Sequence, residues 1–161
     1  MLNVRHISAL AGVLCIASSL GAQGKPTIGQ FIGTSEPLEV ASAAKTDRIA
    51  WIAYDRGMRN VFTAIAPDFK AVRLTNFMED NGVDLTTISL SADGSTAVFV
   101  RGGAANRQGW IADPGHDPDG GDRAIWAVHT TGGVPAVRVA EGQAPTVSPD
   151  GKWVLLSLIH I

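Results

Sequence analysis

The sequence predicts an all-β protein, and three observations support this prediction. The apolar segments after residue 22 are short and bounded by Gly, Asp, Asn and Pro, which is typical of strands. The segments between them have turn chemistry, as in "SADG" and "SPDG", where Asp bonds its own backbone and Gly supplies a positive φ. Similar strand and turn motifs also return along the chain, which indicates a repeated structural unit.

Each strand is expected where an apolar run lies between two such turns. In chain order the predicted strands are about Ile49–Tyr54, Asn60–Ala66, Ala71–Thr75, Leu85–Leu90, Thr96–Arg101, Ala124–His129, Pro135–Val139, Pro145–Ser148 and Lys152–Leu156. Short turns make neighbouring strands antiparallel. We therefore expect meandering antiparallel sheets.

The repeat is clearest around the Asp-Gly turns. "LSADGSTAVFV" (90–100) matches "VSPDGKWVLLS" (147–157), which aligns Asp93 with Asp150. A second echo places "AVRL" of the first unit on "AVRV" of the next. A four-stranded unit of ~40–50 residues repeated in tandem predicts β-propeller blades. A β-sandwich with accidental repeats is the alternative, because short strands and Gly turns suit that fold as well.

The first 22 residues have the layout of a secretory signal peptide. A basic start with Arg5 precedes the uncharged "ISALAGVLCIASSLGA", which is too short to span a bilayer and ends in small residues. A buried N-terminal helix is the alternative. Removal of the signal would also remove Cys15 and leave a mature chain without disulfides. We expect an exported protein, periplasmic or extracellular, with no membrane span in the mature chain.

The rest of the chain divides into three parts. Residues 23–43 are expected to form a lead-in segment, and residues 44–155 an incomplete propeller of about three four-stranded blades. The tail "LSLIHI" (156–161) resembles a translated transposon-end adapter of sequencing libraries, so it is predicted to be non-native. A complete propeller has ~4–8 blades, so this chain is expected to be a fragment.

Composition excludes one class of partner. The net charge is −2, without a basic block, so nucleic acid is not an expected partner. The segment 102–122 is rich in Gly and Asp and contains His116, which suggests a metal site. Its spacing misses the EF-hand loop pattern, so we predict no metal and no other cofactor.

Two quoted motifs point to a known family. "SADGSTAVFVRGG" and "APTVSPDGKWVLLS" resemble the blades of propellers in the prolyl oligopeptidase family of serine peptidases, and in the Tol-associated periplasmic propeller. The order "RGMRNVF", "APDF", "RLT" is more similar to the bacterial dipeptidyl- and acylaminoacyl-peptidase branch. The resemblance implies a propeller that gates peptide substrates for a C-terminal α/β-hydrolase domain.

The catalytic part of such an enzyme is not in this sequence. It has no G-x-S-x-G nucleophile elbow, and the nearest match, "GTSEP" (33–37), has Pro37 in place of Gly. His116, His129 and His160 therefore have no nucleophile to serve. We predict no catalytic residue here, and a partner in the missing hydrolase domain. The alternative is a protein-binding module like the Tol-associated propeller.

The long loop is the one candidate site that the resemblance suggests. Loops beyond ~12–15 residues are usually functional or mobile. In a peptidase propeller, a loop like 102–122 could project toward the substrate chamber. The predicted substrate-side residues are Trp110, as an apolar anchor, with Asp113, His116 and Asp117.

Overall fold

The structure is a computed structural model that describes residues 27–29, 35–111 and 121–158. The strands in chain order are β1 (Glu36–Ser42), β2 (Arg48–Asp55), β3 (Met58–Ile65), β4 (Val72–Arg73), β5 (Leu85–Leu90), β6 (Thr96–Arg101), β7 (Ala124–His129), β8 (Val137–Glu141), β9 (Gln143–Val147) and β10 (Val154–Ser157). The predicted all-β class is confirmed. No helix in the described part of the chain is long and apolar enough to cross a membrane.

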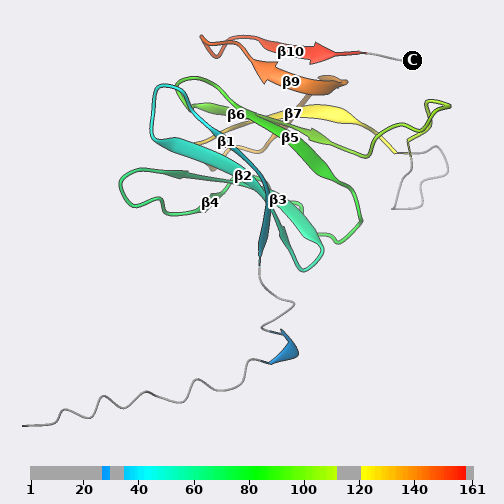
Figure 1. Ribbon diagram of the computed structural model, residues 1–161, viewed down its shortest axis with the longest axis horizontal. Helices are drawn as coiled ribbons and strands as arrows, with labels where there is room; N and C mark the ends of the chain where they lie inside the picture. Colours follow the sequence, from blue (N-terminus) through cyan, green and yellow to red (C-terminus); the bar gives the residue numbers. More distant parts are fainter. Residues whose placement is uncertain (1–26, 30–34, 112–120, 159–161) are drawn as a thin grey trace, which may run out of the picture.

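The strands form three antiparallel sheets arranged in a row (Figure 1). The first sheet has the order β1-β2-β3-β4 and the second β5-β6-β7-β8, while β9 and β10 form a two-stranded third sheet. Each four-stranded sheet is a simple meander, because the connections are turns and loops that return the chain beside itself. This is a partial, propeller-like arrangement of two complete units and half of a third.

The first strands of the three sheets lie next to one another. β5 contacts β1 on one side and β9 on the other. Each of these strands carries one extra residue relative to its partner strand, which is a β-bulge. In the second and third sheets, the bulge includes a residue with positive φ, Thr87 (55°) and Ala144 (51°). These two residues align in the "SADG" and "SPDG" repeat, so the repeat extends to backbone conformation.

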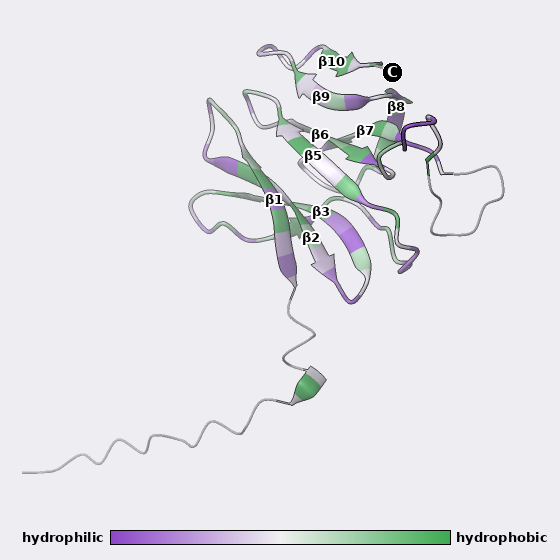
Figure 2. Cartoon of the chain, turned by 45° about the vertical axis from the view of Figure 1, so that its right-hand side comes forward, coloured by the Kyte–Doolittle hydropathy of each residue, from purple (hydrophilic) through white to green (hydrophobic). Residues whose placement is uncertain are grey.

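The core lies between the first and second sheets. Ile52 of β2 and Val61 of β3 face Phe99 of β6 and Val128 of β7 in one buried cluster. Hydrophobic residues recur on strands of all three sheets, as Figure 2 shows, so apolar surface is not confined to this cluster. Both faces of β6 are buried, which explains why its four central residues are apolar without alternation.

The Asp-Gly turns stabilise the row at one end of the sheets. Asp93 Oδ1 accepts hydrogen bonds from Ser91 Oγ (2.6 Å) and from the backbone and side chain of Ser95. These bonds lower the pKa of Asp93 from 3.8 to about 2, with the Ser91 bond as the largest cause. The Ser148 hydroxyl likewise lowers the pKa of Asp150 in the next turn. The same side-chain geometry therefore returns in both turns.

Successive turns also contact one another. The backbone N–H of Lys45, in the first sheet, donates to the carbonyl of Ala92 in the second (2.8 Å). Gly94 has φ +73°, and a Cβ there would lie 2.8 Å from Thr46 Oγ1. Glycine is thus required both by the backbone conformation and by the close approach of the first sheet.

Several boundaries differ from the sequence prediction. A strand, β1, lies within the segment predicted as a lead-in, where no strand was assigned. β4 is shorter than predicted, and β8 begins two residues later because the chain between Thr130 and Ala136 is still turning. β10 extends to Ser157, so it includes the first two residues of the predicted tail. The predicted signal peptide and residues 159–161 lie outside the described residues.

Candidate functional site

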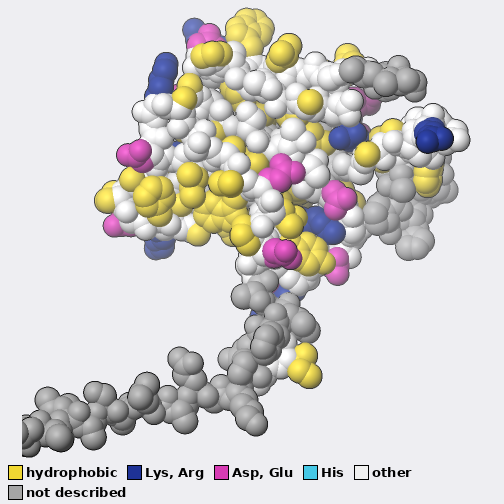
Figure 3. Space-filling view, viewed as in Figure 1, with side chains coloured by type: hydrophobic (Ala, Val, Ile, Leu, Met, Phe, Trp, Pro, Cys, Tyr) yellow, Lys and Arg dark blue, Asp and Glu magenta, His cyan; other side chains and the backbone are white. Residues whose placement is uncertain are grey.

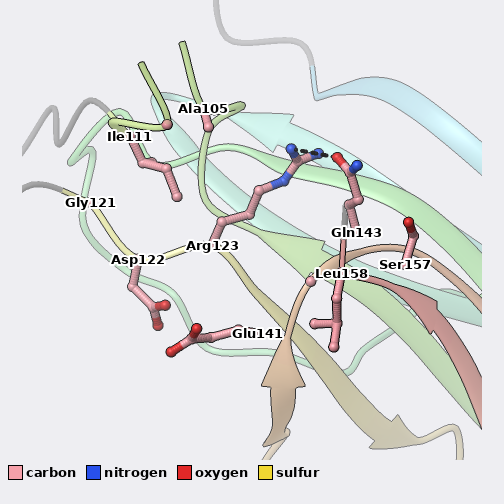
Figure 4. Close-up of a pocket in the computed structure, with 11 residues that line it drawn as sticks. Ala105, Ile111, Gly121, Asp122, Arg123, Glu141, Gln143, Ser157 and Leu158 are labelled. Atoms are coloured by element: carbon pink, nitrogen blue, oxygen red, sulfur yellow. Dashed lines mark hydrogen bonds between the residues drawn. The ribbon is translucent and has the colours of Figure 1, made fainter. Parts of the chain in front are cut away.

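The candidate site is a pocket of about 270 Å³ in the seam between the second and third sheets (Figure 4). It lies at the end of the sheets opposite the Asp-Gly turns, where β6 leads into the long loop and β8 leads into β9. The lining residues are Ala105, Gly109, Ile111, Gly121, Asp122, Arg123, Glu141, Gly142, Gln143, Ser157 and Leu158.

The β6–β7 loop forms one wall of the pocket, and its described part has a definite structure. Ala105 and Ile111 form an isolated antiparallel bridge. Between them, the Asn106 side chain accepts hydrogen bonds from the backbone N–H groups of Gln108 (2.9 Å) and Trp110 (3.0 Å). An Asn side chain that binds backbone groups in this way fixes a tight turn. The turn holds the Trp110 backbone in place while its side chain is exposed.

Two glycines allow the backbone segments of the site to approach closely. Gly102, with φ +113°, begins the loop, and a Cβ at this residue would collide with the carbonyl oxygen of Asp122. Gly142, with φ +140°, joins β8 to β9, and a Cβ there would lie 2.9 Å from the carbonyl oxygen of Ser157. The pocket is therefore built where three segments converge with no room for a side chain.

Arg123 is the cation at the centre of the pocket. It immediately precedes β7, and its Nη1 donates a hydrogen bond to Oε1 of Gln143, the first residue of β9 (3.0 Å) (Figure 4). Its Nε is buried and has no hydrogen-bond partner. Among the described residues, no carboxylate lies within salt-bridge distance of Arg123. A neutral amide therefore faces a permanent positive charge, and one N–H group is left unsatisfied.

The two carboxylates of the pocket have their own cation. Arg138 of β8 donates from Nε and Nη2 to the two oxygens of Asp122, each at 3.1 Å. Its Nη2 also lies 3.5 Å from Glu141 Oε1. The hydrogen bond with Asp122 is the largest cause of the raised pKa of Arg138. Asp122 and Glu141 are thus compensated by Arg138, which leaves Arg123 as the uncompensated charge.

This chemistry is suited to binding rather than to bond cleavage. The residues that line the pocket include Ser157 but no histidine, so the serine has no base beside it. Among the described residues, no group of three or more His, Cys, Asp and Glu side chains could hold a metal ion. A guanidinium without a counter-ion in a partly enclosed pocket is matched by an anionic group, and a carboxylate fits its planar fork of N–H groups.

The sequence-based site prediction overlaps this pocket in part. Trp110 lies on the loop that forms its wall and is exposed there. Asp113, His116 and Asp117 lie outside the described residues. Arg123 and Gln143 were not predicted, because a single charged residue before a strand has no local signature. Their encounter depends on the register of β7, β8 and β9, which the sequence pattern does not reveal.

Comparisons with known proteins give little more than a general similarity. No protein-family model matches the chain, and no curated protein matches it. Among solved structures, the chain is similar to the crystal structure of TolB from Acinetobacter baumannii, with 16% sequence identity and a TM-score of 0.47. The match covers 78% of this chain and 26% of the TolB chain, so this chain spans about a quarter of that protein.

Proposed function

We propose that this chain is a propeller-type module that binds polypeptides through an acidic group, and that Arg123 recognises the carboxylate. The observation that carries the proposal is the uncompensated Arg123 guanidinium, which lines a pocket between two sheets and has a buried, unpartnered Nε. Ile111 in the wall and the exposed Trp110 above it offer apolar contact to residues next to the carboxylate.

The pocket is large enough for a side chain but small for a folded ligand. A volume of about 270 Å³ lies just below the ~300–1,000 Å³ range of small-molecule sites. An Asp or Glu side chain, or a C-terminal carboxylate, would enter while the rest of the segment crossed the β6–β7 loop. Binding would supply the hydrogen-bond acceptor that Arg123 lacks in the described chain.

Peptide gating in a serine peptidase is the finer version of the same proposal. It requires a catalytic domain, and no G-x-S-x-G motif occurs in this sequence. No observation on the described residues favours it over binding alone, so the binding module stands first. Export through a signal peptide is likewise a proposal that rests on the pattern of residues 1–22.

Fluorescence anisotropy with two matched sets of labelled peptides tests the binding proposal. One set carries Asp or Glu at a central position or a free C-terminal carboxylate, and the other carries Asn, Gln or a C-terminal amide. We expect the acidic peptides to bind at least about tenfold more tightly, since a hydrogen bond to a charged group contributes ~1.5–3 kcal/mol. Equal binding of both sets would contradict the proposal.

Three variants locate the binding at the pocket. Arg123→Gln removes the cation, and Gln143→Glu supplies an internal carboxylate, so both should abolish the preference for acidic peptides. Gln143→Glu is the more informative of the two, because it retains Arg123 and its contact across the seam. Arg56→Gln is the matched control, since its side chain is 78% exposed and lies 3.9 Å from Asp55, far from the pocket. Unchanged binding by Gln143→Glu would overturn the assignment.

A further inference from the structure

The two ends of the row of sheets expose apolar faces whose counterparts inside the row are buried. Ala50 of β2, Val98 of β6 and Leu155 of β10 occupy equivalent positions, as the third residue of β2, the third of β6, and the residue aligned with Val98 through the Asp-Gly repeat. Ala50 and Val98 are each 0% exposed, whereas Leu155 is 74% exposed. The residue types are similar, so the difference arises from the neighbouring sheet.

At the other end, the first sheet has an uncovered aromatic pair. Trp51 and Phe62 are cross-strand partners and stack with their ring centroids 5.8 Å apart. They lie on the opposite face from Ile52 and Val61, which pack against the second sheet. Val40 of β1 pairs with Trp51 on this face and is 69% exposed. Figure 3 shows hydrophobic side chains gathered over the first sheet and again over β9 and β10.

The equivalent aromatic pair in the second sheet is covered. Phe99 and Trp126 are cross-strand partners there, and Phe99 is the fourth residue of β6 as Trp51 is of β2. This pair packs against the buried cluster of the first sheet. The uncovered faces at the two ends are therefore two halves of the same sheet-to-sheet contact that already joins the first and second sheets.

We propose that a second copy of this chain completes the contact. The outer face of β9 and β10 in one copy would pack on the β1 and β2 face of the other, with Leu155 against Val40 and Trp51. This is a head-to-tail contact, which closes into a ring when the rotation per subunit allows it. Two copies would bring together twice the three sheets of one chain, within the ~4–8 blades of closed propellers.

A second copy is favoured over other occupants because it carries the complementary surface by construction. Both halves have already been selected to fit one another inside the chain, at the junction of the first and second sheets. The outward face of the third sheet adds Trp153, which is 73% exposed beside Leu155, and Figure 2 shows hydrophobic residues on β10 although it lies at the end of the row. Apolar surface of this kind is typical of subunit contacts.

Sedimentation velocity and light scattering on the purified full chain test the proposal over micromolar concentrations. We expect a dimer that dissociates on dilution. Val40→Lys breaks one half of the contact and Leu155→Lys the other, and both residues are exposed, so neither change should unfold the subunit. Each variant alone should be monomeric. Val134→Lys, at a half-exposed residue in the β7–β8 turn, is the control and should remain dimeric.

Mixing the two monomeric variants distinguishes a head-to-tail contact from a symmetric one. Val40→Lys retains an intact third sheet and Leu155→Lys an intact first sheet, so the mixture should regain a heterodimer with one intact contact. A symmetric face-to-face dimer would instead leave one of the single variants dimeric. A monomeric parent chain, a dimeric single variant, or species that grow beyond the dimer with concentration would each overturn the proposal.

Discussion

The second sheet and the third sheet show how the same sequence pattern leads to opposite degrees of burial. Val98 and Leu155 are aligned by the Asp-Gly repeat, yet Val98 is completely buried and Leu155 is 74% exposed. The second sheet has a neighbour on both faces, whereas the third has a neighbour on one. Burial in this molecule therefore depends on the position of a sheet in the row, while the strand pattern itself is local.

The largest effect is expected where the comparison is sharpest, in the core between the first two sheets. Phe99→Ala should destabilise the chain by about 3–5 kcal/mol, because the side chain is fully buried and a cavity would remain. Trp51→Ala, at the equivalent position of the uncovered first face, should cost clearly less. Urea denaturation followed by circular dichroism measures both. Equal losses would show that the first face is covered in solution.

A pair of glycines separates backbone strain from contact between sheets. Gly94→Ala should cost more than Gly109→Ala, although both residues have positive φ, at +73° and +82°. Strain of ~1–2 kcal/mol from the left-handed conformation is common to both variants. Only at Gly94 does the new Cβ meet the first sheet, since nothing lies within 4 Å at Gly109. Thermal melts of the two variants provide the comparison, and equal shifts would argue against a tight contact between the turns.

The Asp-Gly turns predict a smaller, pH-dependent effect. The pKa of Asp93 is about 2 in the folded chain and 3.8 as the ordinary value. A lowered folded pKa contributes stability that is complete above the unfolded value and is lost as the pH falls through the folded value. Stability should therefore decrease between about pH 4 and pH 2, and Asp93→Asn should flatten this part of the pH profile.

Asp150→Asn serves as the matched variant for that prediction. Its carboxylate also has a lowered pKa, but its turn belongs to the third sheet at the end of the row. We expect its effect on global unfolding to be smaller than that of Asp93→Asn. Urea midpoints at a series of pH values measure both. An acid limb that is unchanged in Asp93→Asn would show that the turn bonds do not stabilise the fold.

The sequence was most informative where turns bracket a strand on both sides. β5, β6 and β7 begin and end at the predicted residues, because Asp-Gly, Gly-Gly and Asp-Arg segments limit them. β1 was not predicted because "EPLEVAS" contains two acids and a Pro and is exposed along most of its length. Its strand character comes from pairing with β2 rather than from its own composition.

The candidate site was less predictable than the strands. Trp110 was found because it lies in an unusually long loop, a feature that length and composition reveal. Arg123 and Gln143 are twenty residues apart and meet only after β7, β8 and β9 have taken their places. The unpartnered Nε of Arg123 is a property of the assembled seam, so no sequence pattern announces it.

The measurement that tests the repeated contact most directly is thiol reactivity at its three equivalent positions. In a Cys15→Ser background, single cysteines at Ala50, Val98 and Leu155 would be titrated with a thiol reagent in dilute, non-denaturing buffer. We predict that Ala50→Cys and Val98→Cys react only on unfolding, and that Leu155→Cys reacts at once and becomes protected as the concentration rises. Equal reactivity at all three positions, or a fully protected Leu155→Cys in dilute monomer, would contradict the account.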